Sequence, residues 1–200
     1  MQATEFTTTL VRSHYIMALE GTNNLVFGAA HSTPLSDQKI IFDDRTREAM
    51  GWPDSFRTMY DYRNRIPAIY NRMYQLCIIS LCSDVEFFFK SLFDSAYIPH
   101  PKDRGFFQRF EQVSAALTRH GLSLMPVTSE IAALAHAFNI RHMCIHNFGI
   151  VDEAFTAKST YPVKIGDFYM IGQEEYRPMF DGYVAILLHI DRWLATTLKE

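Results

Sequence analysis

Apolar residues recur at helical spacing along most of this chain. The longest run extends from Pro67 to about residue 93, and neither glycine nor proline interrupts it after its first residue. Within it, Met73, Cys77 and Leu81 are four positions apart, so they share one face of a helix. Pro67 suits the first turn, where a backbone N–H is not needed. The pattern predicts one long helix in the middle of the chain.

Other helices are predicted where such runs lie between residues that cap or stop helices. Three of them are predicted over residues 7–20, residues 107–119, which Gly121 follows, and residues 178–198. A short helix should be capped by Asp43 or Asp44 and ended by Gly51 and Pro53. Another should run from Thr128 or Ser129 to Gly149. Gly21 and the pair Asn23 and Asn24 are expected to end the first helix. A loop with Gly28 and Pro34 should follow it.

Two short stretches favour strands instead. Residues 163–165 and 168–171 flank the turn-prone pair Gly166 and Asp167, which predicts a β-hairpin. The expected fold class is therefore all-α: a helical bundle with one small β-hairpin before the C-terminal helix. We expect a single domain over residues 1–200, with residues 1–60 as an N-terminal helix and loop extension and residues 66–200 as the core bundle.

Composition is that of an ordinary globular domain. Hydrophobic residues make up 48% of 200 residues, which suffices for a core. No apolar run is long enough to span a bilayer, and the first residues lack the order of a signal peptide, so we expect a cytoplasmic protein without a membrane partner. Cys77, Cys82 and Cys144 are an odd number without a Cys-x-x-Cys motif, which indicates neither a disulfide framework nor a zinc knuckle.

A formal net charge of -3 does not favour general binding to nucleic acid, so any RNA contact must be local. The local candidates are Arg57, Arg63, Arg65 and Arg72, which alternate with tyrosines. Arginine and tyrosine together suit phosphate contact and base stacking. The alternative interpretation is a solvated helix start whose tyrosines pack into the core.

The most unusual segment is residues 139–147, where Arg141, His142 and His146 interrupt an otherwise apolar helix. At about 100° per residue, these side chains share one broad arc of the helix. A guanidinium and an imidazole on one arc can converge on one anion. The alternative is a set of polar groups satisfied by local hydrogen bonds in a packed helix. Spacing alone leaves both open.

Other chemistry is less well supported by the motifs. His142 and His146 have the spacing of a helical metal pair, but no glutamate follows the first histidine and no third ligand is evident. We therefore expect no metal and no cofactor. Cys144 and His146 lie about 160° apart round the helix, so they cannot form a nucleophile and base pair. The chain also lacks a phosphate-binding loop, a dinucleotide fingerprint and a serine-hydrolase elbow.

Residues 140–152 resemble the signature of the HEPN superfamily, in which an arginine, a polar residue, a short spacer and a histidine precede a helix end that contains glycine. Glu86 on the long upstream helix and the predicted hairpin and last helix downstream follow the order of elements in that family. The resemblance runs from about Ile66 to the C-terminus and implies an HEPN-like bundle.

The resemblance also implies a function: a metal-independent endoribonuclease, typical of toxin or phage-defence systems, that leaves 2',3'-cyclic phosphate and 5'-hydroxyl ends. Its site would form where two protomers of a homodimer bring their signature helices together on an RNA substrate. Arg141 would stabilise charge on phosphorus, and His146 would act as general base or acid. His142, Glu86 and Asn147 would support them, with Glu86 orienting Arg141.

One departure from the family concerns its regulation. HEPN toxins that pair with nucleotidyltransferase antitoxins often carry a tyrosine two residues after the histidine, and this chain has Phe148 there. That kind of regulation is therefore in doubt, although an antitoxin or another regulatory protein stays among the expected partners. The alternative function is a catalytically silent HEPN-like dimer that binds RNA, nucleotide or a protein. The presence of both Arg141 and His146 favours the enzyme.

Overall fold

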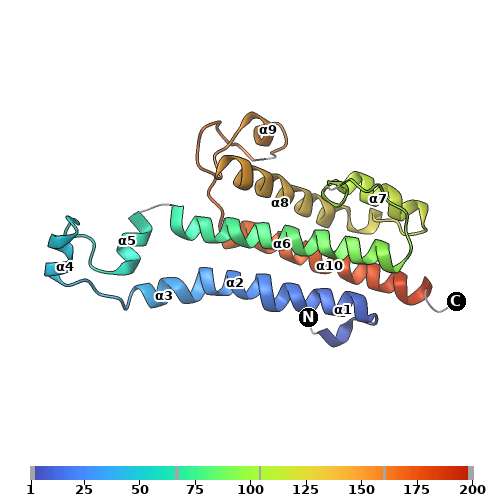
Figure 1. Ribbon diagram of the computed structural model, residues 1–200, viewed down its shortest axis with the longest axis horizontal. Helices are drawn as coiled ribbons and strands as arrows, with labels where there is room; N and C mark the ends of the chain where they lie inside the picture. Colours follow the sequence, from blue (N-terminus) through green and yellow to red (C-terminus); the bar gives the residue numbers. More distant parts are fainter. Residues whose placement is uncertain (1–2, 66–67, 104, 160, 198–200) are drawn as a thin grey trace.

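The computed structural model describes residues 3–65, 68–103, 105–159 and 161–197. Figure 1 shows an elongated bundle in which the long helix α6 (Ala68–Ser95) lies between the N-terminal helices and α8 (Thr128–Asn147), with α10 (Gln173–Thr197) running beside it. The described residues form helices, loops and two isolated β-bridges, without a sheet. The all-α prediction is confirmed at this level.

The long central helix forms as predicted, because its apolar residues can pack on two sides. Ile78, Leu81 and Val85 are fully buried in the core. Its predicted first residue, Pro67, lies outside the described part of the chain, as does Ile66, where the core bundle was predicted to begin. None of the described helices combines the length and the hydrophobicity needed to cross a membrane.

The N-terminal helix is longer than predicted. After a short 3-10 turn, η1 (Ala3–Glu5), the helix runs without interruption to Asp37. It consists of three α-helical parts, α1 (Thr9–Met17), α2 (Asn24–Phe27) and α3 (Thr33–Asp37). Two π-helical segments, η2 (Ala18–Asn23) and η3 (Gly28–Ser32), join them. The predicted end at Gly21 and the predicted loop at Gly28 and Pro34 are therefore wrong. The widened turns coincide with Gly21 and Gly28, so the helix accommodates these two glycines in π segments, whereas Pro34 lies in the first turn of α3.

Contacts with α6 explain why this helix continues. The buried hydroxyl of Thr22 donates to the carboxylate of Asp84 at 2.6 Å and lies 2.7 Å from the hydroxyl of Ser80. Further along, Val26 is buried in the main core. Residues up to Asp37 thus pack as part of the bundle, whereas we expected them to form an extension of it.

Only residues 38–65 project from the end of the bundle (Figure 1). They contain α4 (Asp44–Ala49) and α5 (Met59–Arg65). Asp43 caps α4 as predicted, since its carboxylate accepts the backbone N–H of Thr46 at 2.7 Å. A small aromatic cluster organises the rest, with Trp52 stacked on Tyr62 at 4.7 Å between ring centroids.

The second half of the chain supplies the other side of the bundle. Its remaining elements are η4 (Phe106–Gln108), α7 (Phe110–Arg119), η5 (Met125–Val127) and α9 (Glu153–Thr156). The helix near residues 107–119 and its end at Gly121, which has a φ of +86°, agree with the prediction. The last helix begins at Gln173, so Pro178 lies inside it and does not start it. Leu198 lies outside the described residues.

The predicted hairpin before α10 is not confirmed. Gly166 makes a turn with a φ of +89°, but residues 163–171 contain no strand. This segment pairs instead with the chain leaving α8: Val151 donates its N–H to the carbonyl of Asp167 at 2.9 Å, and Tyr169 donates to Gly149 at 2.8 Å. The backbone groups that a hairpin would have paired with each other are used to anchor the loop to the end of α8.

Candidate active site on helix α8

Helix α8 carries the signature residues and ends where the sequence predicts. Phe148 and Gly149 take left-handed backbone conformations with φ of +54° and +83°. A side chain at Gly149 would also require Gln75 on α6 to shift, because its Cβ would lie 2.3 Å from the amide nitrogen of Gln75. The predicted caps at Thr128 and Ser129 do not form, since neither hydroxyl accepts a backbone N–H at the start of the helix.

Arg141 points from α8 toward α6. Its Nη1 forms an ion pair with Oε1 of Glu86 at 2.9 Å, and Gln108 donates to the other oxygen of Glu86 at 3.2 Å. The guanidinium carbon lies 5.9 Å from the centre of the Phe138 ring, and the arginine side chain is 21% exposed. The two residues that the signature associates, Arg141 and Glu86, are thus in contact, and Nε of Arg141 is buried without a hydrogen-bond partner.

His142 and His146 lie on the exposed side of α8. Their ring centroids are 4.5 Å apart, and the ring planes are tilted by 47°. Within the described residues, no hydrogen bond or ion pair joins either ring to another side chain. The two imidazoles are therefore available to a ligand or to a second protein chain.

A single chain does not direct Arg141 and His146 to the same point. They are about 140° apart round the helix axis, with Ile145 between them. The side chain of Arg141 contacts Glu86 on α6, and His146 is exposed to solvent. Within one chain, the two side chains thus have different surroundings.

Asn147 has a local role in the structure. Its amide donates to the carbonyl of Ile150 at 3.0 Å and lies 3.5 Å from the carboxylate of Asp152. Asp152 in turn caps α9 by accepting the N–H of Phe155 at 2.7 Å. Asn147 therefore ties the end of α8 to the loop that follows.

The four candidate RNA-binding arginines do not gather on α8. Arg63 forms an ion pair with the buried carboxylate of Asp37 at 2.9 Å, and Arg72 donates to Gln75 at 2.7 Å. Arg57 lies in the projecting part of the chain and is exposed, and the side chain of Arg65 lies outside the described residues. Arg63 and Arg72 thus use part of their hydrogen-bonding groups on contacts within the chain.

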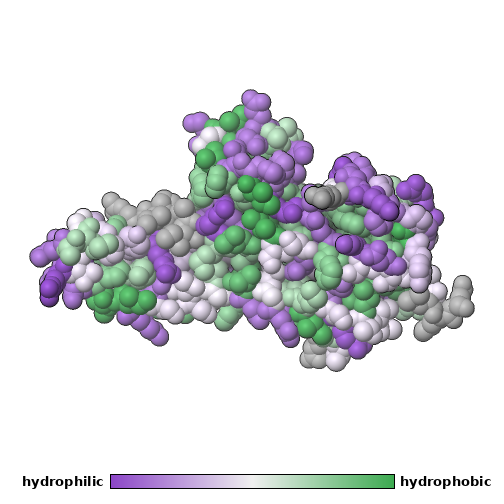
Figure 2. Space-filling model, viewed as in Figure 1, coloured by the Kyte–Doolittle hydropathy of each residue, from purple (hydrophilic) through white to green (hydrophobic). Residues whose placement is uncertain are grey.

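An apolar surface adjoins the signature residues. Figure 2 shows hydrophobic residues where the C-terminal half of α8 lies along α6. Phe148 is 73% exposed and Ile145 is 47% exposed, and Leu76 on α6 and Ile150 beyond the helix end are exposed too. Large apolar side chains that gather on a surface are typical of a contact with another molecule.

The sequence did not reveal a second polar cluster, which includes His136 near the middle of α8. Nε2 of His136 lies 3.1 Å from Oε1 of Glu175, which also accepts the hydroxyl of Tyr169 at 2.5 Å. Burial and the neighbouring Glu175 carboxylate raise the pKa of Tyr169. His136 is far in sequence from Tyr169 and Glu175, so no local motif could have identified the cluster.

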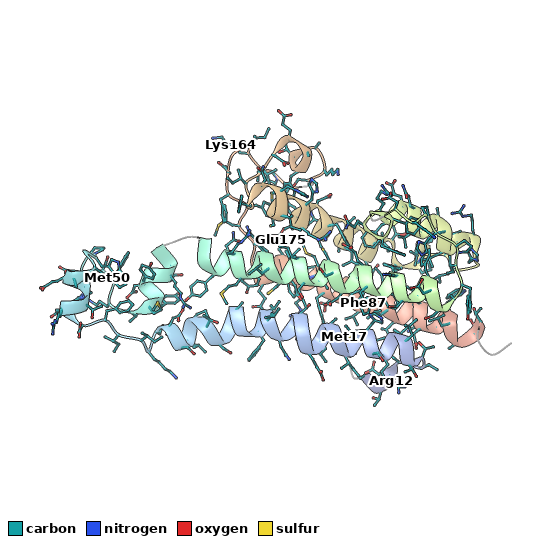
Figure 3. All side chains as sticks on the ribbon, in the orientation of Figure 1. Arg12, Met17, Met50, Phe87, Lys164 and Glu175 are labelled. Atoms are coloured by element: carbon teal, nitrogen blue, oxygen red, sulfur yellow. The ribbon has the colours of Figure 1, made fainter. Side chains whose placement is uncertain are left out.

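This cluster borders a hollow in the described structure. The hollow has a volume of about 890 Å³ and is lined by Tyr161, Lys164 and Glu174 as well as by Tyr169 and Glu175. Figure 3 labels Lys164 on the loop beside α9 and Glu175 near the start of α10. Neither Arg141 nor His146 lines this hollow.

Comparisons with known proteins do not add to this geometry: no family model matches the chain, and no similar curated protein or solved structure is found. The resemblance to the HEPN superfamily thus depends on residues 140–152 and on the order of the helices. In the described chain, no three side chains of histidine, cysteine, aspartate or glutamate gather as a metal site. Function has to be argued from α8 itself.

Proposed function

We propose that this chain is a metal-independent endoribonuclease of the HEPN type, active as a symmetric homodimer. The observation that carries the proposal is that His146 is exposed on α8, Arg141 is partly exposed on the neighbouring flank, and exposed apolar Ile145 lies between them. A two-fold axis at Ile145 would cover the apolar surface and bring Arg141 of one protomer close to His146 of the other.

The proposed reaction is an internal transesterification of RNA. The 2'-oxygen of a ribose attacks the adjacent phosphorus, and the bond from phosphorus to the 5'-oxygen breaks. One His146 takes the proton from the 2'-hydroxyl, and the protonated His146 of the other protomer gives a proton to the leaving oxygen. Arg141 stabilises the negative charge that develops on the phosphoryl oxygens.

Glu86 has two effects in this proposal. It holds the guanidinium in place through the 2.9 Å ion pair, which favours a positioned catalytic group. It also offsets the charge of Arg141, which would weaken the attraction for phosphate. The second effect favours the alternative function, a catalytically silent dimer that binds RNA, nucleotide or a protein partner.

Cleavage of RNA by the purified chain distinguishes the two functions. We expect wild type to produce 2',3'-cyclic phosphate ends with EDTA present, and we expect Arg141→Ala and His146→Ala each to lower the rate by about 100-fold or more with the fold retained. His120→Ala, an exposed histidine at the end of α7, is the matched control and should cleave like wild type. Binding of RNA without cleavage by wild type would support the silent dimer instead.

A further inference from the structure

The two exposed histidines of α8 have a geometry that the proposed reaction does not explain. His142 and His146 are one helical turn apart, and their ring centroids are separated by 4.5 Å. In the proposed chemistry only His146 transfers a proton. The close approach of a second imidazole is therefore an independent feature of the surface.

The spacing of the two rings suits a metal ion held between them. An ion held at 2.0–2.1 Å from one nitrogen of each imidazole would place the ring centroids about 5 Å apart. The observed separation of 4.5 Å is close to this value, so the helix places the two rings at a distance that suits one ion. The helix fixes the spacing before the ion arrives, which lowers the entropy cost of binding.

The chemistry around the rings agrees with a cation. Neutral imidazole is a common ligand of zinc and of neighbouring divalent transition metals. The nearest arginine on the helix, Arg141, is already paired with Glu86, so its repulsion of a second cation is offset. Since both histidines are exposed, an ion can reach them from solvent.

We propose that His142 and His146 form a binding site for a divalent transition metal ion such as Zn²⁺. No third ligand from the described part of the same chain gathers at a metal site. Water therefore completes the coordination in a single chain, or a second His142 and His146 pair does so where two copies of α8 meet. Four imidazole nitrogens would make a closed tetrahedral site.

Binding there has a consequence for cleavage that rests on the proposed function. A metal ion occupies a nitrogen lone pair of His146, which then cannot accept a proton from the 2'-hydroxyl. The ion is thus an inhibitor of the ribonuclease and has no role in its chemistry. Removal of metal by EDTA leaves cleavage intact, whereas added zinc stops it.

Titration of the purified chain with zinc chloride, followed by calorimetry, tests the site without any RNA. We expect binding by wild type with one ion per chain or per two chains, and a loss of affinity of about tenfold or more in both His142→Gln and His146→Gln. His120→Gln should bind zinc like wild type. Equal zinc affinity of wild type and all three variants, or no zinc binding by wild type, would refute the proposed metal site.

Cleavage assays then separate this inference from the proposed function. Saturating zinc should inhibit wild type, and EDTA should restore the rate. The ratio of rates with and without zinc should approach one in His142→Gln. If the chain binds zinc but does not cleave RNA, the proposed metal site is supported and the proposed ribonuclease function is refuted. Cleavage that continues at its full rate with zinc bound would refute the inhibition.

Discussion

A single glycine sets the end of the helix that carries the candidate site. Gly149 has a φ of +83°, which disfavours any residue with a side chain, and the amide of Gln75 occupies the space where a Cβ would be. Gln75 itself is fully buried and accepts a hydrogen bond from Arg72, so its amide cannot move away freely. The position of Phe148 and of the loop beyond α8 therefore depends on the absence of a Cβ atom at residue 149.

Replacement of this glycine tests that dependence. We expect Gly149→Ala to lower the free energy of unfolding by about 1–3 kcal/mol, from backbone strain and the contact with Gln75. Gly21→Ala is the matched control, since Gly21 lies within a helical segment and its added Cβ would meet no atom within 4 Å. It should be neutral or stabilising by about 0.5–1 kcal/mol. Urea denaturation of both variants gives the measurement, and equal stability of Gly149→Ala and wild type would contradict the argument.

At the scale of elements, the two ends of the chain are joined through one carboxylate. Asp191 on α10 is buried and accepts the N–H groups of Thr7 and Thr8 at 2.8 Å each, together with the hydroxyl of Thr8 at 2.6 Å. Burial alone would raise the pKa of Asp191, but these hydrogen bonds outweigh it and lower the pKa. The start of α1 is thus capped from another helix.

This cap makes stability depend on pH in a defined direction. Because the pKa is lower in the folded state, the carboxylate stabilises the fold above the unfolded value of about 3.9, and this contribution is lost as the pH falls through the folded value. Asp191→Asn should cost about 1–3 kcal/mol at pH 7, and its difference from wild type should shrink below about pH 4. Asp181→Asn is the control, as Asp181 is exposed on the same helix. A difference from wild type that stays constant with pH would contradict the role of the charge.

At the scale of the whole molecule, the uncovered side of α8 decides whether a site can form. The surface around Ile145 and Phe148 is apolar, and the two signature residues lie on either side of it. The commonest way for a chain to cover such a surface is contact with the same surface of a second copy. The proposed enzyme therefore requires a dimer through α8.

Light scattering at micromolar concentration should report about twice the chain mass of 23.1 kDa for wild type. Phe148→Asp should shift the protein to a monomer and abolish cleavage, since it places a charge in the contact, and aspartate tolerates the left-handed backbone at this position. Tyr97→Asp is a matched control, because Tyr97 also has a positive φ, of +52°, and is 90% exposed. A wild-type monomer that cleaves RNA would refute the composite site.

The sequence alone determined the features that depend on neighbouring residues. The long helix α6 follows from an uninterrupted apolar period, Asp43 caps α4 through its own third neighbour, and Gly149 ends α8 because it accepts a left-handed backbone. The grouping of Arg141, His142 and His146 on one arc of α8 was likewise predictable, since helix geometry depends only on spacing. All of these are local consequences of backbone geometry.

Tertiary contacts decided the rest, because they join residues that are far apart in the chain. The N-terminal helix passes Gly21 because Thr22 bonds to α6, a gain that exceeds the local preference to stop. The segment 166–169 pairs with the end of α8 instead of folding back as a hairpin. The contact between Arg141 and Glu86, and the uncovered side of α8 that exposes His142 and His146, depend on how three helices pack, which no single segment specifies.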